Sequence, residues 1–306
     1  MWLLSLIDAT HNELKEIQEN AKSILHFLAE EVGERTLRKY DNLNRTRQFI
    51  HDYLKKYNHK VYEENYFVNG MEVSNVIAEI PGFEDSDEII IIGAHYDTIE
   101  DTPGADDNGS AIAGLLELHR LLSHFSFRKT LRFVAFTLEE PPFFSGPYMG
   151  SMVHAKGCKE RDEHINLMIC LEMIGYAGSR MHQDYPLSSM QKEYPPYGNF
   201  LAVVALPSYA PYAYKWKREY NKFAKNKIFD MIGPASIPGI NLSDHYSFNK
   251  YSFPAIMITD TAFYRNKNYH TEGDTYQTIN FKFMAEAIFN IFLAVKTIAN
   301  ERDILQ

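Results

Sequence analysis

Cysteine is almost absent from this sequence, since Cys158 and Cys170 are the only two among 306 residues. Two cysteines cannot build a disulfide framework or a cysteine-based zinc site, so any metal must be bound by His, Asp and Glu. Basic residues are also in deficit, because 31 Lys and Arg face 40 Asp and Glu and form no basic stripe. We therefore expect no nucleic-acid partner.

Long apolar runs are missing as well. No segment reaches the roughly 18 uninterrupted apolar residues that a membrane span needs. The apolar start, residues 1–7, stops at Asp8 without a basic leader or a cleavage site, so we expect no signal peptide. The sequence predicts a cytoplasmic protein without a membrane partner, and it leaves the oligomeric state open.

What is present is the composition of a globular protein, with 45% hydrophobic and 23% charged residues. No low-complexity tract or linker divides the chain. We expect a single domain over residues 1–306, with N-terminal helices at about 11–57 packed on it.

Apolar periodicity predicts strands alternating with helices. Strands are expected at residues 60–67, 73–80, 89–94, 130–138, 165–171, 200–206 and 255–259. Helices are expected at 11–32, 41–57, 108–122, near 149, at 212–225, after 241 and at 281–299, with a long loop at 176–198. The alternation predicts an α/β fold, a three-layer αβα sandwich with a mixed, mostly parallel central sheet.

Polar residues that can bind metals follow the apolar strands at the points where these strands end. The run at 89–94 lacks polar alternation, as a strand covered on both faces does, and it leads directly into His95 and Asp97. In an open α/β sheet, the carboxyl ends of the strands meet at one edge, where ligands bind. The residues at these ends are His95, Asp106, Glu139, Glu140, Glu172 and His270.

This set of side chains has a coherent chemistry. Carboxylate and imidazole ligands suit Zn²⁺ without any cysteine, and one carboxylate can bridge two metals about 3.5 to 4 Å apart. Glu139 and Glu140 are adjacent and point to different sides, so one can bind a metal while the other acts on a water. Asp97 lies two residues past His95 and is placed to orient its imidazole.

The motifs together resemble the M28 family of zinc aminopeptidases and related carboxypeptidases. The resemblance covers about residues 75 to 280 and rests on H-x-D, G-A-D-D-N-G-S-A, E-E, L-E-M-I-G-Y, S-D-H and Y-H-T-E-G-D-T, in this order. The run EEPPFFSGPYMGS at 139–151 resembles a bacterial branch of the family. The resemblance implies a metalloprotease, most simply an aminopeptidase, that hydrolyses a peptide or a small amide.

By position, the resemblance also implies a ligand set for two zinc ions per chain. Asp106 would bridge the two ions. His95 and Glu172 would complete one metal site, and Glu140 and His270 the other. Many aminopeptidases have Asp where this chain has Glu172, which is kept as a ligand.

Three catalytic residues are predicted, Asp97 from its spacing to His95 and the other two, Glu139 and Tyr269, from the resemblance. Glu139 would be the general base that takes a proton from the bridging water and returns it to the leaving amine. Asp97 would support His95. Secreted members have an oxyanion-stabilising tyrosine three residues before S-D-H, where this chain has Ile240, so Tyr269 is the substitute candidate. The alternative for Tyr269 is an aromatic residue that only packs beside the site. The peptide bond between residues 106 and 107 is usually cis in the family.

Several alternatives stay open at this point. Asp244 and His245 either line the pocket or orient a ligand, or else belong to a helix cap followed by a surface histidine. A carboxypeptidase of the same family, a one-zinc glutaminyl cyclase with the same fold and a non-catalytic binding module are the other functions. The complete ligand set favours two metals and hydrolysis.

Overall fold

The computed structural model describes residues 2–57 and 60–305, and within these ranges eight strands form one sheet in the order β1-β2-β4-β3-β5-β8-β6-β7. The strands are β1 (Lys60–Val68), β2 (Met71–Ile80), β3 (Asp85–His95), β4 (Lys129–Phe136), β5 (His164–Glu172), β6 (Leu201–Ala205), β7 (Ile228–Ile232) and β8 (Ala255–Thr259).

Four neighbouring strands at the centre, β4, β3, β5 and β8, run parallel. The β1–β2 hairpin lies on one side of them, with β2 antiparallel to β4, and on the other side β6 is antiparallel to β8 and parallel to β7. The predicted mixed sheet is confirmed. The strand β7, which has only five residues and lies at the sheet edge, was not predicted from the sequence.

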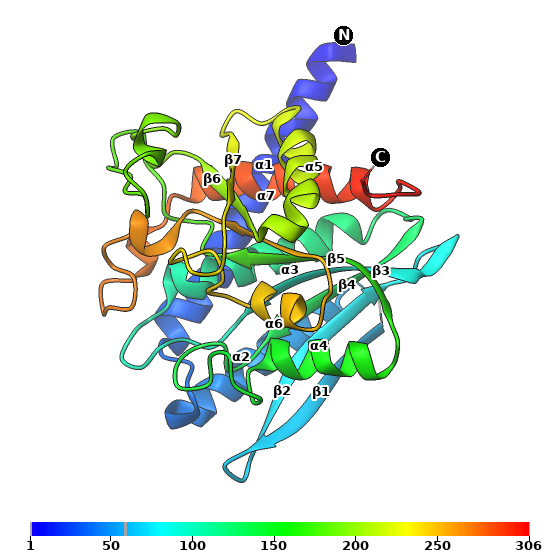
Figure 1. The fold of residues 1–306 in the computed structure, drawn as a ribbon, viewed down its shortest axis with the longest axis vertical. Coiled ribbons are helices and arrows are strands. Elements are labelled where there is room, and N and C mark those ends of the chain that lie inside the picture. The colour runs from blue at the N-terminus through cyan, green and yellow to red at the C-terminus, as the bar shows by residue number, and fades with distance from the viewer. Residues whose placement is uncertain (1, 58–59, 306) are drawn as a thin grey trace.

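Seven α-helices within the described ranges surround the sheet (Figure 1). They are α1 (Trp2–His26), α2 (Tyr40–Lys55), α3 (Ala111–Leu122), α4 (Gly150–Glu160), α5 (Ala210–Asn221), α6 (His245–Lys250) and α7 (Phe281–Ile298). Two π-helical turns, Phe27–Val32 and Ala105–Ser110, and five 3-10 turns, Leu37–Lys39, Met190–Lys192, Pro207–Tyr209, Ala262–Tyr264 and Tyr276–Thr278, complete the helical elements of these ranges. None of the described helices has the length and apolarity to cross a membrane.

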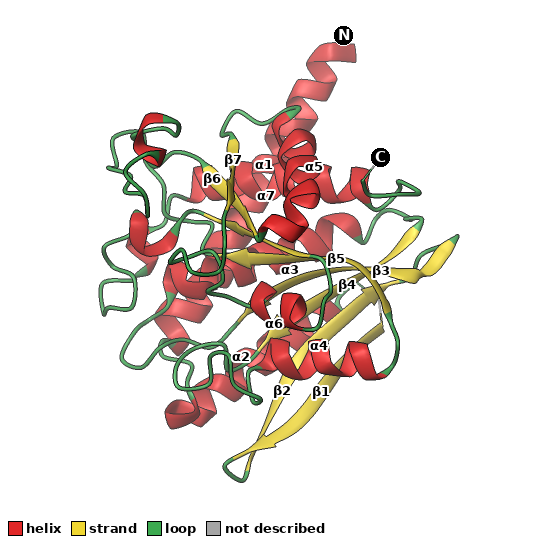
Figure 2. Cartoon of the chain, in the orientation of Figure 1, coloured by secondary structure: helices red, strands yellow, loops and turns green. Residues whose placement is uncertain are grey.

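The isoleucine run of β3 shows why the sheet has helices on both faces. Successive side chains of a strand point to opposite faces. Ile90 and Ile92 pack in a core with residues of α1, α2, α3, α5 and α7, whereas Ile89 and Ile91 pack in a second core with residues of α4 and α6. Figure 2 shows the strands between these two groups of helices. The predicted three-layer αβα sandwich is confirmed.

The segment between β3 and α3 differs from the prediction. A regular helix was expected from about residue 108, but Ala105–Ser110 forms an irregular π-helical turn and α3 begins only at Ala111. Gly104, which precedes the turn, has a positive φ of 59°. This irregular turn contributes to the candidate site.

Candidate metal centre

The carboxyl ends of the parallel strands bring the predicted residues together. His95 and Glu172 are the last residues of β3 and β5. Glu139 and Glu140 follow β4, and His270 lies in the loop after β8. Five residues of the predicted constellation converge at this edge: His95, Glu139, Glu140, Glu172 and His270. A sixth residue, the aspartate Asp107 in the turn before α3, joins them.

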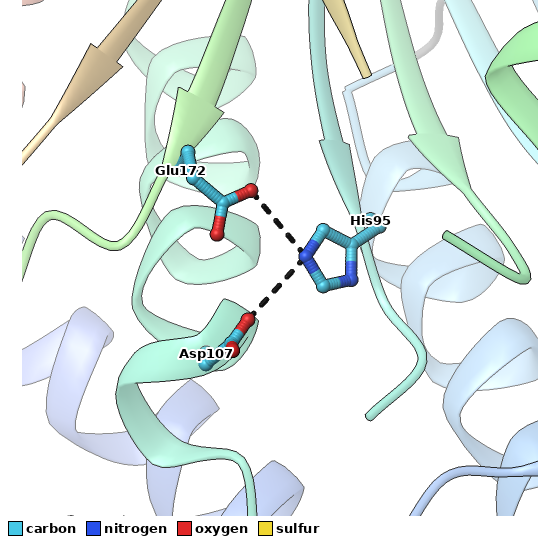
Figure 3. A group of neighbouring side chains, drawn as sticks. All are labelled: His95, Asp107 and Glu172. Atoms are coloured by element: carbon cyan, nitrogen blue, oxygen red, sulfur yellow. Dashed lines mark ion pairs between the residues drawn. The ribbon is translucent and has the colours of Figure 1, made fainter. Parts of the chain in front are cut away.

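The first group of candidate ligands consists of His95, Asp107 and Glu172, all buried (Figure 3). Nε2 of His95 lies 3.5 Å from Oδ1 of Asp107 and 3.4 Å from Oε2 of Glu172. On the other side of the ring, Nδ1 of His95 lies 3.2 Å from the carbonyl oxygen of Asp97. A donor at Nδ1 leaves Nε2 with its lone pair facing the two carboxylates.

The second group consists of Asp107, Glu140 and His270. Nε2 of His270 lies 3.2 Å from Oδ2 of Asp107 and 3.3 Å from Oε2 of Glu140. Asp107 therefore belongs to both groups, because its Oδ1 faces His95 and its Oδ2 faces His270. Burial opposes ionisation of Asp107, but the two imidazoles outweigh it and lower the pKa of this carboxyl.

The expectation that Asp106 joins the two groups is wrong. Oδ1 of Asp106 accepts hydrogen bonds from the Ser110 hydroxyl at 2.9 Å and the Gly175 amide at 3.0 Å, and Oδ2 accepts one from the Asn266 amide at 3.1 Å. Asp107 has non-helical angles, with φ at −98° and ψ at 95°, so the two consecutive side chains point in different directions. The non-proline cis bond likewise follows Asp107 instead of preceding it.

Asp274 holds this turn in place from the far end of the chain. Its two carboxylate oxygens accept hydrogen bonds from the backbone amides of Asp106, at 2.9 Å, and Asp107, at 3.0 Å. No role was predicted for Asp274 from the sequence, although it is the aspartate of the Y-H-T-E-G-D-T motif. Its place in that motif, four residues after His270, was the sequence signal that could have identified it.

Asp97 lies behind the site and not in its cleft. Its carboxylate accepts hydrogen bonds from the backbone amides of Glu139, at 3.0 Å, and Glu140, at 3.1 Å. Oδ1 also lies 3.5 Å from Nδ1 of His95. Asp97 thus connects the end of β3 to the loop after β4, which places it as a positioning residue for both.

Glu139 lies next to the first group without belonging to either one. Its Oε2 is 3.9 Å from Nε2 of His95, and the side chain lines a cleft of about 120 Å³ above the two groups. Burial raises the pKa of Glu139 well above its ordinary value; His95 opposes this effect, and the carboxylates of Glu140 and Glu172 reinforce it. A carboxyl with a raised pKa beside a cleft suits proton transfer.

The S-D-H segment contributes through its serine. The Ser243 hydroxyl donates a hydrogen bond of 2.6 Å to Oε2 of Glu172 and so orients that carboxylate. Asp244 is fully buried, which raises its pKa to about 7. His245 is also buried, and its Nε2 lies 2.8 Å from the Ile240 carbonyl, so it is not a surface histidine.

Tyr269 lies flat against His270, with ring centroids 3.8 Å apart and an interplanar angle of 16°. It lines the cleft and also a neighbouring cavity of about 220 Å³. Burial raises the pKa of its hydroxyl, and the surrounding carboxylates add to this effect, so the hydroxyl keeps its proton. Tyr269 is therefore a hydrogen-bond donor at the border between the cleft and the cavity.

The neighbouring cavity is apolar in character. Its wall is formed largely by the loop at 176–198, together with β6, β7 and the residues after β7. Three tyrosines in this wall donate their hydroxyl protons to backbone carbonyls and present only their rings: Tyr185 to Pro195 at 2.6 Å, Tyr194 to Asp230 at 2.6 Å and Tyr264 to Pro238 at 3.1 Å. The cavity thus offers mainly apolar surface.

The charges that line the cleft and the cavity are mostly negative. In the described parts of the chain, the lining residues include no lysine or arginine. His270 is the basic side chain of the cleft, and the acidic ones are Asp107, Glu139, Glu140 and Glu172, with Asp184 and Glu193 in the cavity. This surface favours a cationic group of a ligand over an anionic one.

The two groups fit metal ions. Two imidazole nitrogens and three carboxylates form the donor set, and within each group the candidate ligand atoms lie within 4.8 Å of one another. Oδ1 of Asp107 and Oε1 of Glu140 are buried and have no hydrogen-bond partner among the described residues. Buried carboxylates this close together need a cation to neutralise them.

Comparisons with known proteins identify relatives of this chain. Residues 75–295 match the family model described as Peptidase family M28. A protein of Escherichia coli (strain K12) named Uncharacterized protein YfbL is 39% identical over 279 residues, which are 88% of this chain and 85% of that protein. Leucine aminopeptidase 2 of Trichophyton rubrum is 28% identical over 217 residues, which are 67% of this chain and only 41% of that protein.

Solved structures share the fold. A zinc aminopeptidase from Bacillus subtilis, BSAP, aligns with a TM-score of 0.75 and 14% identity, over 93% of this chain and 95% of that one. A glutaminyl cyclase of Tannerella forsythia aligns with a TM-score of 0.67 and 19% identity, over 91% and 98%. At these identities the likeness establishes a common architecture, on which different chemistries can be built.

Proposed function

Because the chain belongs to peptidase family M28, we propose that it is a zinc aminopeptidase that removes N-terminal residues from peptides at a two-metal centre. The observation that carries this proposal is the position of Asp107, whose two carboxylate oxygens face two different groups of ligands. A shared carboxylate can bridge two metal ions, which lie about 3.5 to 4 Å apart in two-metal sites.

The proposed zinc ligands are those of the two groups, with Asp107 in place of Asp106: His95, Asp107, Glu140, Glu172 and His270. When bound, two zinc ions would polarise the carbonyl of the scissile bond and lower the pKa of a water. Asp97 and Ser243 would keep His95 and Glu172 in the orientation that binding needs.

In the proposed reaction, Glu139 takes a proton from the attacking water and passes it to the amine of the leaving peptide. The position of Glu139 next to the first group and in the wall of the cleft supports this role. Tyr269 would donate its hydroxyl proton to the carbonyl oxygen as negative charge develops there. Its ring stacking on His270 would fix the direction of the hydroxyl.

The charges of the lining support an aminopeptidase over a carboxypeptidase. A free N-terminal amine would meet acidic side chains that are not proposed zinc ligands, Glu139 in the cleft and Glu193 in the cavity, whereas a free C-terminal carboxylate would meet no lysine or arginine in the described lining. Unpaired negative charges facing one another in a cleft are destabilising. The apolar cavity beside Glu172 and Tyr269 would take the side chain of the N-terminal residue, which favours large apolar residues.

A glutaminyl cyclase is the second candidate, because the Tannerella forsythia cyclase has this fold. That reaction needs a single zinc and an N-terminal glutamine. The second group around His270 supports the peptidase instead, since a one-metal enzyme would not require it.

Metal analysis and one substitution test the proposal. Purified protein should contain about two zinc ions per chain, and Glu139→Gln should lower kcat about 10²- to 10⁴-fold while keeping the metal. Glu160→Gln, which changes an exposed glutamate on α4, is the matched control and should leave kcat unchanged.

The substrate class is tested with peptides blocked at either end. Peptides beginning with leucine or phenylalanine should be cleaved, and N-terminal acetylation should stop cleavage while C-terminal amidation should not. A single firmly bound zinc, or full activity in Glu139→Gln, would contradict the two-metal mechanism. Cleavage of acetylated peptides would contradict the aminopeptidase assignment, and release of a cyclised N-terminal glutamine would favour the cyclase.

A further inference from the structure

Arg35 is a fully buried arginine that comes from outside the family-matched residues 75–295. It follows the π-helical turn Phe27–Val32 and precedes α2, in the N-terminal part of the chain. Burying a guanidinium is costly unless its donors are satisfied. The hydrogen-bond partners of Arg35 therefore show which part of the structure this buried side chain stabilises.

The guanidinium of Arg35 binds both ends of the loop that connects His95 to the turn with Asp107, two of the three ligands of the first group. Nε donates to the carbonyl of Tyr96 at 2.8 Å, immediately after His95. Nη1 donates to the carbonyl of Pro103 at 2.8 Å, and Nη2 to that of Gly104 at 2.8 Å, just before the turn with Asp107. One side chain thus ties the exit of β3 to the turn that carries the shared carboxylate.

The backbone of Arg35 strengthens the same connection. Its amide donates to the Thr98 hydroxyl at 3.0 Å, and its carbonyl accepts from the Thr98 amide at 3.2 Å. Two further bonds from Nη1, to the carbonyls of Leu28 at 3.1 Å and Gly33 at 3.0 Å, fix the guanidinium to the end of the π-helical turn. The loop at 96–104 is therefore anchored on the N-terminal segment.

The loop closes tightly around this guanidinium at Gly104. A Cβ at that position would lie 2.8 Å from Nη2 of Arg35 and 2.3 Å from Cγ2 of Thr98. Gly104 also has a positive φ of 59°, a conformation that glycine adopts without strain. Arg35 thus packs directly against the start of the turn that carries Asp107 and leaves no room for a side chain at Gly104.

The charge of Arg35 acts on the same site. All five side-chain hydrogen bonds go to carbonyl oxygens, so no acceptor neutralises the cation directly. Burial lowers the pKa of Arg35 to about 10, and the nearby carboxylates, chiefly Asp274 and Asp97 and then Asp107 and Glu140, act in the opposite direction. Arg35 remains charged and places one positive charge behind the crowded carboxylates.

From these contacts we propose that Arg35 is a positioning residue of the metal centre, which holds His95 and Asp107 at the spacing that metal binding needs. The proposal rests on the proposed two-zinc function. It makes the N-terminal segment a component of the site, although this segment lies outside the matched family region. Arg35 acts on His95 and Asp107 only through the backbone of the loop at 96–104. The test must therefore measure metal affinity.

The test compares Arg35→Met and Arg35→Lys with a matched control, Arg132→Met. Arg132 is 5% exposed, lies on β4 and binds Glu79 and Glu163 away from the metal ligands. Zinc affinity is measured on metal-stripped protein by competition with a chromophoric chelator, and Tm is measured in parallel. We expect Arg35→Met to weaken zinc binding about 10- to 100-fold, the range known for residues that orient ligands.

Arg35→Lys separates positioning from folding. It keeps the charge but cannot reproduce the five bonds, so it should recover part of the affinity lost in Arg35→Met. Arg132→Met should lower Tm while changing zinc affinity by no more than about twofold, as expected for a distant site. If Arg35→Met does not fold, Arg35→Lys decides the question, with an expected loss of zinc affinity of several-fold or more.

Two different results would overturn the two proposals. Wild-type affinity in Arg35→Lys or in folded Arg35→Met would refute the positioning role, and so would an equal loss in Arg132→Met. Wild-type protein that binds no zinc would instead refute the proposed function, and the role of Arg35 at a metal centre with it.

Discussion

Two adjacent aspartates have different roles because the backbone between β3 and α3 turns sharply. Asp107 faces both histidines, whereas Asp106 accepts hydrogen bonds from Ser110, Gly175 and Asn266. Asp107→Asn should therefore remove both zinc ions. Asp106→Asn should keep them but lower the free energy of unfolding by about 1 to 3 kcal/mol, because an amide cannot accept all of these bonds.

Zinc content and urea unfolding of the two variants check this prediction. Loss of zinc in Asp106→Asn with full zinc in Asp107→Asn would reverse the assignment. The sequence placed both aspartates at the right strand end, since the apolar run at 89–94 and the following polar cluster are local signals. It could not tell which carboxylate faces the histidines, because that depends on Gly104 and on Asp274, which lies 167 positions after Asp107.

At the scale of elements, strongly apolar strands and long periodic helices were predictable, and the short edge elements were not. The strands β3, β4 and β5 are buried on both faces, so their composition alone identifies them. The edge strand β7 contains only five residues, three of them half-buried, and its sequence IFDMI has no clear alternation. Its position depends on pairing with β6, which is a tertiary effect.

The loop at 176–198 was expected over or beside the site, and it forms part of the wall of the apolar cavity. Leu187 in this wall is 45% exposed. Leu305, which does not line the cavity, has the same exposure and serves as the control. Leu187→Asp should raise KM for peptides that begin with leucine about tenfold and leave kcat nearly unchanged, since it removes apolar contact surface that a substrate would cover.

Steady-state kinetics of Leu187→Asp and the control Leu305→Asp check this prediction. The control should leave KM for the same peptides unchanged. An unchanged KM in Leu187→Asp, or an equal rise for peptides that begin with alanine, would show that the cavity does not bind the N-terminal side chain.

At the scale of the whole molecule, a charged network ties the outer part of the sheet to the segment after α4. Arg132 of β4 donates to Glu79 of β2 at 2.8 Å and to Glu163 at 2.6 Å, and Arg161 donates to Glu163 at 2.9 Å. Burial would raise the pKa of Glu163, but the two arginines outweigh it and lower the pKa from 4.5 to about 2. This network lies outside the metal centre and contributes to the stability of the fold.

The direction of the pH dependence follows from that lowered pKa. A carboxyl whose pKa is lower in the folded state stabilises the protein above its unfolded pKa, and this contribution disappears as the pH falls through the folded value. For Glu163 this loss of stability falls between about pH 4.5 and about pH 2.

In metal-stripped protein, Glu163→Gln should lower the free energy of unfolding most above pH 4.5, and its deficit against wild type should shrink toward pH 2. Urea unfolding across this range measures the deficit, with Glu160→Gln at an exposed site as the control, and a deficit that stays constant with pH would contradict the arginine network as its cause.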